Sequence, residues 1–322
     1  MFGDAIVEPE QIRDTSVSLA SANFLDPNLL YQKLQSKSGW TKAMRTHERS
    51  CEIQDNFGIM DFSLKAKSRQ CKDTDQAYFQ QRQDSTVWTN VREGNSLLVE
   101  HNPDEDNRVS NVTFLRQGLP KIFNLTSDAV HSEKHAFIPK DDEQAYYHYD
   151  TLAQVRKALM EGSQVEVVRS LKTNGDGACV TWAPALNAWI ITSENVSIAA
   201  RNENDVKTLY PEQTRYFLAR KIALCWFRRV NQIKKQGTAK LDALKQDLTR
   251  YVFVGDFIGN KDLINLIKYP RETICFHSVV VKDRTAETAQ STSYCEANSF
   301  ALLKRHHLDV VPSRQCGIYS SY

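Results

Sequence analysis

The sequence has 322 residues, of which 41% are hydrophobic and 25% are charged, as in an ordinary globular protein with one large or two modest domains. Its 41 basic and 39 acidic side chains give a net charge of +2, which neither requires nor excludes nucleic acid as a partner, so such binding would need a local basic face. No apolar run approaches the roughly 18 residues of a membrane span, and the N-terminus lacks the cationic start and apolar block of a secretory signal.

The first hundred residues are weakly patterned. A short helix is expected over 23–34, with Asp26 as its N-cap and Pro27 at its first position. The segment 65–82 is charged and rich in glutamine, which is typical of a solvated helix or loop. Alternating apolar residues predict strands over 57–62, 96–99 and 109–115.

An arginine and a lysine then stand five residues apart around a Gly/Pro corner. The segment begins at Arg116, passes Gly118 and continues as Lys121-Ile122-Phe123-Asn124. Taken alone, this composition is typical of an ordinary surface loop.

The centre of the chain carries the most informative stretch. A short helix from Thr151 to Gly162 leads into a strand that contains Val165 and Val167. Lys172 follows, then a glycine-rich corner and a returning strand over 179–182. Asn-Gly and Asp-Gly are strong turn signals, so we expect a hairpin with the lysine at its mouth.

A lysine in such a place is a candidate covalent nucleophile. An amine attacks only when it is deprotonated, and a rigid, cation-rich pocket favours that form. The alternative interpretation of Lys172 is an exposed lysine beside a turn.

The second half of the chain alternates strands with helices. Strands are expected over 188–193, 196–199, 250–257 and 272–281, and helices over 212–235 and 238–249. The third of these is an apolar strand that stops at Gly255 and delivers a carboxylate, Asp256. His277 alternates with apolar residues and is interpreted as structural, whereas His306 and His307 are expected at the surface.

The cysteines indicate the compartment. They are odd in number and lack the spacing of a zinc site or a disulfide framework, so a reducing compartment, cytoplasmic or nuclear, is expected. The seven are Cys51, Cys71, Cys179, Cys225, Cys275, Cys295 and Cys316.

The order of these pieces resembles the covalent nucleotidyltransferases, most closely the ATP-dependent RNA ligases of the T4 RNA ligase 1 type. In that family a KxDG or KxNG box supplies a lysine that becomes adenylylated. Glu194 stands where the family's "SKGS" strand has a lysine, and Asp256 where the family mostly has glutamate. The matching positions are Arg116 with Gly118, 121–124, Lys172-Thr173-Asn174-Gly175, 191–197, 254–257 and Phe276.

The resemblance implies an α+β protein with the nucleotidyltransferase (ATP-grasp-like ligase) fold, in which helices flank antiparallel sheets. It places an N-terminal extension of mixed α/β character at 1–108 and an adenylyltransferase domain at 109–322. Two family elements expected after Phe276, an EGxV-like strand and a strand with two lysines, are not found; Cys295-Glu296-Ala297 matches the first poorly. The domain therefore looks truncated at its C-terminus or degenerate.

The resemblance also implies the chemistry. Lys172 would accept AMP from ATP and pass it to an RNA 5′-phosphate, which a 3′-hydroxyl then attacks, in RNA repair or tRNA processing. Asp256 would help to hold Mg²⁺. The implied ATP-binding residues are Arg116, Lys121, Asn124, Asn174, Gly175 and Phe276.

Two other functions remain open. One is a non-catalytic nucleotide- or RNA-binding relative that keeps the pocket. The other is a DNA ligase or mRNA-capping guanylyltransferase, which the arginine-glycine and K-I-F-N elements make the weaker interpretation.

Overall fold

The computed structural model describes residues 25–65, 90–91, 94–105, 108–119, 158–194, 196–259, 269–282 and 296–319. The strands are β1 Met44–Ser50, β2 Phe57–Leu64, β3 Asn95–Asn102, β4 Arg108–Arg116, β5 Val165–Ser170, β6 Asp176–Ala183, β7 Ala188–Thr192, β8 Ser197–Ala200, β9 Tyr251–Ile258, β10 Thr273–Val281 and β11 Ser313–Tyr319. The helices are α1 Pro27–Ser36, α6 Glu203–Leu209, α7 Phe217–Gln236, α8 Thr238–Arg250 and α9 Glu296–Arg305, with 3-10 turns η3 Gly39–Ala43 and η5 Pro184–Leu186.

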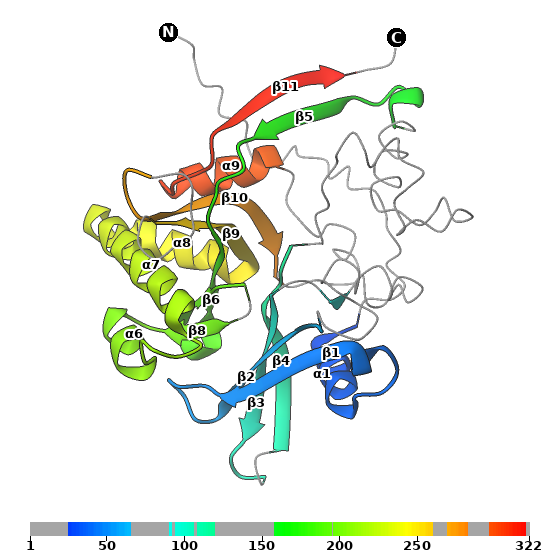
Figure 1. The fold of residues 1–322 in the computed structure, drawn as a ribbon, viewed down its shortest axis with the longest axis vertical. Helices are drawn as coiled ribbons and strands as arrows, with labels where there is room; N and C mark the ends of the chain where they lie inside the picture. Colours follow the sequence, from blue (N-terminus) through cyan, green and yellow to red (C-terminus); the bar gives the residue numbers. More distant parts are fainter. Residues whose placement is uncertain are drawn as a thin grey trace.

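The described strands form three antiparallel sheets, so the chain is an α+β protein, as predicted. Their orders are β1-β2-β3-β4, β10-β9-β6-β7-β8 and β11-β5. In Figure 1 the four-stranded sheet and α1 lie at the bottom, the five-stranded sheet with α7 and α8 lies above them, and the β5–β11 ribbon is at the top.

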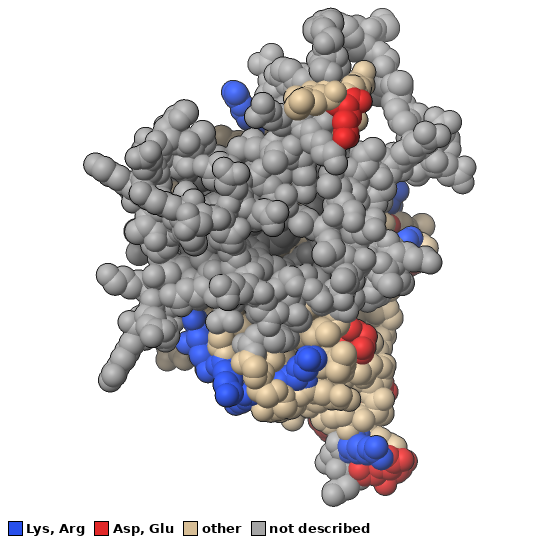
Figure 2. All heavy atoms as spheres, turned by 90° about the vertical axis from the view of Figure 1, so that its right-hand side faces the viewer, with Lys and Arg blue, Asp and Glu red and all other residues tan. Residues whose placement is uncertain are grey.

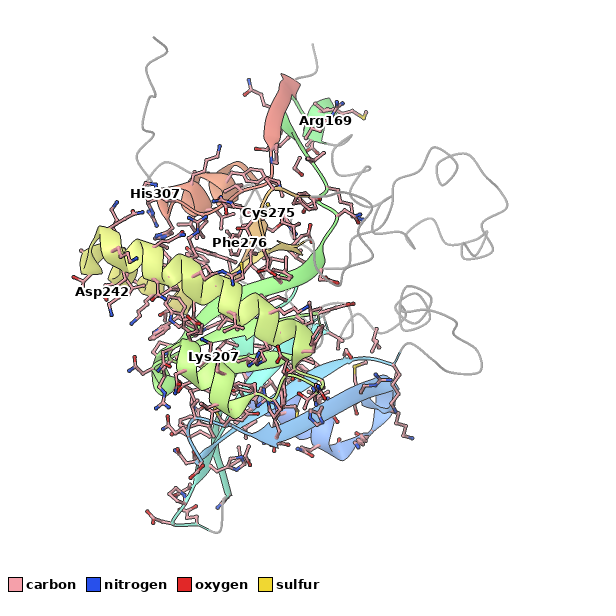
Figure 3. The ribbon with its side chains drawn as sticks, turned by 60° about the vertical axis from the view of Figure 1, so that its left-hand side comes forward. Arg169, Lys207, Asp242, Cys275, Phe276 and His307 are labelled. Atoms are coloured by element: carbon pink, nitrogen blue, oxygen red, sulfur yellow. The ribbon has the colours of Figure 1, made fainter. Side chains whose placement is uncertain are left out.

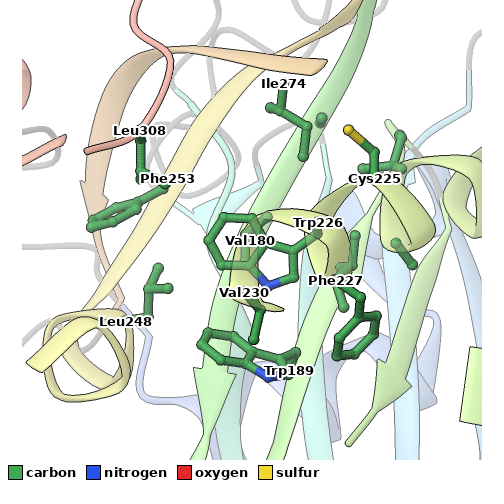
Figure 4. Close-up of a cluster of buried hydrophobic side chains, with 14 of the residues drawn as sticks. Val180, Trp189, Cys225, Trp226, Phe227, Val230, Leu248, Phe253, Ile274 and Leu308 are labelled. Atoms are coloured by element: carbon green, nitrogen blue, oxygen red, sulfur yellow. The ribbon is translucent and has the colours of Figure 1, made fainter. Parts of the chain in front are cut away.

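The main core lies between the five-stranded sheet and helices α7 and α8. The apolar stripe of α7 buries Trp226 and Phe227, as its helical spacing predicts. Trp189 of β7 packs edge-to-face against Trp182 and Trp226, with ring centroids 4.8 and 5.4 Å apart. Figure 4 shows Trp189 of the sheet close to Trp226 and Phe227 of α7.

The four-stranded sheet is covered on both faces. Helix α1 covers one face with Leu30 and Leu34, and the other packs against Ile190 and Ala199 of the five-stranded sheet. Asp26 caps α1 as predicted, because its carboxylate accepts hydrogen bonds from the backbone N–H groups of Asn28 and Leu29, at 3.0 and 3.1 Å.

A polar network also joins these two sheets. Glu52 accepts hydrogen bonds from the hydroxyl groups of Tyr210 and Tyr216, at 3.0 and 3.1 Å, and from Arg49 at 2.7 Å.

Strands β3 and β4 are neighbours in one sheet. The four-stranded sheet therefore contains strands from both sides of the domain boundary expected at residue 108.

Several elements have no counterpart among the sequence-based expectations. They are β1, α6, α9 and β11. The poor EGxV match lies where α9 begins, at Glu296. The segment 66–89 and most of the helix expected from Thr151 lie outside the described residues.

Candidate nucleotidyl-transfer site

The lysine at the centre of the sequence analysis lies in the connection between β5 and β6. Lys172 is exposed. The predicted hairpin is wrong: β5 pairs with β11, whereas β6 pairs with β7 and β9. The lysine therefore stands where the chain passes from one sheet to another.

The reason for this departure is visible at Gly175. The residue is not among the glycines with positive φ, so it forms no primed hairpin turn. A Cβ at this position would stand 2.5 Å from the carbonyl oxygen of Phe257 and 2.9 Å from Cγ2 of Ile258. Glycine is required here because the connection runs directly against β9.

Gly175→Ala should therefore lower the thermal midpoint of unfolding by several degrees, since overpacking against backbone costs about 1–3 kcal/mol. Gly177→Ala is the matched control, because nothing lies within 4 Å of a Cβ there. Thermal unfolding followed by circular dichroism measures both. Equal midpoints for the two variants would show that the close approach at Gly175 is not a constraint.

Two side chains hold the residues after Lys172. The hydroxyl group of Thr173 donates a hydrogen bond to Oδ2 of Asp256 in β9. The backbone N–H of Asn174 donates to the hydroxyl oxygen of Tyr269, at 2.9 Å. These bonds fix the backbone on the C-terminal side of the lysine and bring it to the predicted carboxylate.

Negative charge gathers at this end of the sheet. Burial and the nearby Asp256 carboxylate raise the pKa of Asp176, whose Oδ2 is buried without a hydrogen-bond partner in the described part of the chain. Burial lowers the pKa of His277, although the Asp256 charge opposes the shift, so this ring is neutral near pH 7. The site can therefore attract a cation.

Phe276 does not occupy the place expected for an adenine-stacking residue. Its side chain is only 2% exposed and packs edge-to-face against Trp226 and Phe253, with ring centroids 6.1 and 6.2 Å apart. Strand alternation explains this, because Ile274 and Phe276 point toward the helices whereas Cys275 stays half-buried on the other side. Figure 3 shows Cys275 and Phe276 next to each other on β10. In this conformation neither face of the Phe276 ring is free for a base.

Arg116 is buried at the end of β4, with a side chain 1% exposed. Its guanidinium group donates to the hydroxyl group of Thr192 and to the carbonyl oxygens of Ser193 and Glu194, the last two at 3.1 and 3.4 Å. These contacts clamp the end of β7 to the four-stranded sheet. The structure therefore gives this predicted ATP-binding arginine a structural task.

Arg116→Leu should lower the free energy of unfolding by about 3 kcal/mol, because it leaves buried acceptors in the β7–β8 turn without donors. Arg108→Leu is the matched control on the same strand. The Arg108 side chain is exposed, so this substitution should change the free energy of unfolding by no more than about 0.5 kcal/mol. Equilibrium urea unfolding measures both, and a wild-type midpoint for Arg116→Leu would contradict the clamp.

The remaining predicted ligands divide as follows. Asn174 and Gly175 follow Lys172 closely in the chain, and Asp256 contacts Thr173, whereas Lys121 and Asn124 lie outside the described residues. No cluster of three or more metal-ligating side chains occurs among the residues that the structure describes. A single carboxylate fits Mg²⁺ only when substrate phosphates and water supply the other ligands.

Sequence reasoning assigned no role to three polar residues, Thr173, Tyr269 and Lys282. Thr173 and Tyr269 carry no recognisable signal, since their roles depend on contacts 83 and 95 residues away along the chain. Lys282 directly follows β10, is 5% exposed and donates from Nζ to the carbonyl oxygen of Trp182 at 2.9 Å. A lysine directly after three valines was the available signal for a buried amine.

Figure 2 shows side chains of both charge signs, Lys or Arg and Asp or Glu, among the described residues visible on that face. No helix among the described residues is long and apolar enough to cross a membrane.

No protein family and no curated protein matches the sequence. Among solved structures, the chain is similar to a Naegleria gruberi RNA ligase with PPi, at 12% identity and a TM-score of 0.34, over 86% of this chain and 83% of that one. A mutant of that ligase with ATP and Mn gives 11% identity and a TM-score of 0.34, over 87% and 84%. Another mutant, with AMP and Mn, gives 12% and 0.33, over 87% and 84%. This is a distant likeness of fold, and it assigns no residue.

Proposed function

We propose that the chain is an ATP-dependent RNA ligase adenylyltransferase domain in which Lys172 carries AMP. The observation that carries the proposal is the placement of this lysine: it is exposed, and the residue that follows it is hydrogen-bonded to Asp256. The order of the sequence motifs supports the same reading. Nucleotidyl transfer uses an amine as nucleophile and a carboxylate as metal ligand, and here the carboxylate is bonded to the residue that follows the lysine.

The reaction follows from these groups. The neutral amine of Lys172 attacks the α-phosphorus of ATP; an N–P bond forms, the bond to the pyrophosphate oxygen breaks, and the amine loses a proton. AMP then passes from the lysine to the 5′-phosphate of an RNA end. A 3′-hydroxyl attacks this activated phosphate, seals the strand and releases AMP.

Asp256 is the residue of this chain that would hold Mg²⁺. Its Oδ2 accepts the Thr173 hydroxyl hydrogen bond, which fixes the orientation of the carboxylate toward the lysine connection. Bound there, the ion would offset the negative charge of the triphosphate. Asp176 is not itself a ligand in this account but adds to the negative potential at the site.

A second candidate is a non-catalytic nucleotide- or RNA-binding relative. The buried ring of Phe276 favours it, because a pocket without an aromatic platform holds adenine less tightly. Incubation with α-³²P-ATP and magnesium, followed by denaturing electrophoresis, separates the two. The ligase becomes covalently labelled by ATP and not by GTP; a binding protein stays unlabelled, and labelling by GTP alone would indicate a guanylyltransferase.

A further inference from the structure

A cavity of about 460 Å³ lies between the four-stranded sheet and the β7–β8 turn. This volume is in the range of small-molecule sites in proteins. Its walls come from β1, β2, the start of β3, the β7–β8 turn and the segment ahead of α7. The residues that line it are Arg45, Thr46, His47, Asp61, Phe62, Ser63, Leu64, Gly94, Asn95, Arg116, Glu194, Val196 and Arg215.

The sheet presents a polar row to this region. In the strand register, His47 lies opposite Asp61, Asp61 opposite Ser96, and Ser96 opposite Arg116. Directly opposed residues of antiparallel strands project from the same face. Farther along the same face, Ile59 packs with Ile190 of β7 and Ala199 of β8 and stands opposite Arg49. Three members of the row, Asp61, Ser96 and Arg116, are buried, whereas His47 is exposed. Buried polar groups are costly unless they are paired or a function maintains them.

Two members of the row, Asp61 and Arg116, keep a buried side-chain atom without a hydrogen-bond partner among the described residues, and Asp61 is the acidic one. Its side chain is 6% exposed, and Oδ1 accepts hydrogen bonds from the hydroxyl groups of Ser96 and Ser197, at 2.7 and 2.8 Å. Oδ2 is buried without a hydrogen-bond partner among the described residues, and the nearest cation, Nη2 of Arg215, is 3.8 Å away. A buried carboxylate oxygen without a donor costs more than about 1–3 kcal/mol, so a donor from a ligand explains its retention.

Two arginines at the cavity are available to an anion. Arg45 is exposed and has no ion pair within the described part of the chain. Arg215 is 36% exposed, and its guanidinium group lies 3.8 Å from Asp61 and over the ring of Tyr216. Burial and the charge of Arg215 lower the pKa of His47, so this ring is neutral near pH 7 and offers one donor and one acceptor. Glu194 is an exposed acidic residue of the lining, and Arg116 is engaged with the β7–β8 turn.

We propose that this cavity binds a nucleotide, with Arg45 and Arg215 as the partners of its phosphate and Asp61 Oδ2 accepting a hydrogen bond from a hydroxyl or amino group of the same molecule. Arginine suits the phosphate because it donates in a planar fork, and a buried carboxylate selects a ligand that carries a donor. The nucleotide is either free or the phosphorylated end of an RNA. The choice of a nucleotide as the ligand rests on the proposed function. The site for an anion and the site for a hydrogen-bond donor are inferred from the two arginines and from Asp61.

The test measures equilibrium binding by calorimetry in the Lys172→Ala chain, which cannot form a lysyl adduct. The ligands are AMP, adenosine, a short 5′-phosphorylated RNA and the same RNA without its phosphate. Arg45→Gln and Arg215→Gln should each weaken binding of the phosphorylated ligand about tenfold, as expected for one charge-assisted contact, and leave its unphosphorylated partner unchanged. Arg108→Gln, an exposed arginine of the same sheet that does not line the cavity, is the control and should bind as the parent does.

The outcomes separate the sources of the ligand. If the arginine variants lose affinity for AMP alone, the natural ligand is a free nucleotide. If they lose affinity for the phosphorylated RNA alone, the natural ligand is an RNA end. Asp61→Asn should weaken phosphorylated and unphosphorylated ligands alike. The proposal would be overturned if both arginine variants bound AMP and the phosphorylated RNA as tightly as the Lys172→Ala chain does. It would also be overturned if the Lys172→Ala chain bound none of these ligands. If only the ligase function is wrong, the cavity still binds these ligands, but the wild-type chain is not labelled by ATP.

Discussion

Lys172→Ala should abolish covalent labelling by ATP while the thermal midpoint of unfolding stays at its wild-type value. The side chain is exposed and lies in a connection between sheets, so its loss removes the nucleophile without opening the core. Lys172→Arg should fail equally, because a guanidinium group stays protonated and cannot attack phosphorus. Labelling intensity on a denaturing gel and a thermal melt are the two measurements.

Lys42→Ala is the matched control for this experiment. Lys42 is also an exposed lysine, but it lies in η3, ahead of the four-stranded sheet. The control should label at the wild-type rate. Retained labelling of Lys172→Ala would show that another residue accepts AMP and would remove the basis of the proposed function.

Asp256→Asn should slow adenylylation at least about a hundredfold, the scale of losing one preorganised electrostatic contact. The amide keeps the size of the side chain and can still accept the Thr173 hydrogen bond, so the connection that carries Lys172 keeps its course. The amide lacks only the negative charge that the carboxylate would present to the metal ion. Initial rates of labelling across a magnesium titration measure the effect.

Asp242→Asn controls for the general loss of a negative charge. Asp242 is exposed on α8, where Figure 3 places it away from Cys275 and Phe276 of β10. Its magnesium dependence should match that of the wild type. If the curve for Asp256→Asn also matched the wild type, Asp256 would only position Thr173.

Local pattern predicted much of the secondary structure. The apolar spacing of α7 and the Asp26–Pro27 start of α1 depend on neighbours within one or two helical turns, and both predictions are confirmed. The pairing of β5 with β11 could not be predicted this way. It joins residues more than 140 positions apart, and the local Asn-Gly and Asp-Gly signals favoured a hairpin instead.

The residues of the candidate site were named from the sequence, but the directions of their side chains were not. The lysine and the acidic residue were identified from sequence, and the structure brings Thr173, next to the lysine, to that carboxylate. The direction in which Phe276 points depends on strand register, which a one-residue shift reverses. His306 was expected at the surface, but it is 7% exposed and lies 2.6 Å from Asp247 of α8, because α9 packs where no helix was foreseen.

The central claim is that Lys172 becomes covalently bonded to AMP, and mass spectrometry of the wild-type chain tests it most directly. The protein is incubated with ATP and magnesium, digested, and the peptides are searched for an added AMP. The account predicts this addition on the peptide that contains Lys172, and its absence after incubation with GTP. AMP on a different residue, or no addition at any ATP concentration, would contradict it.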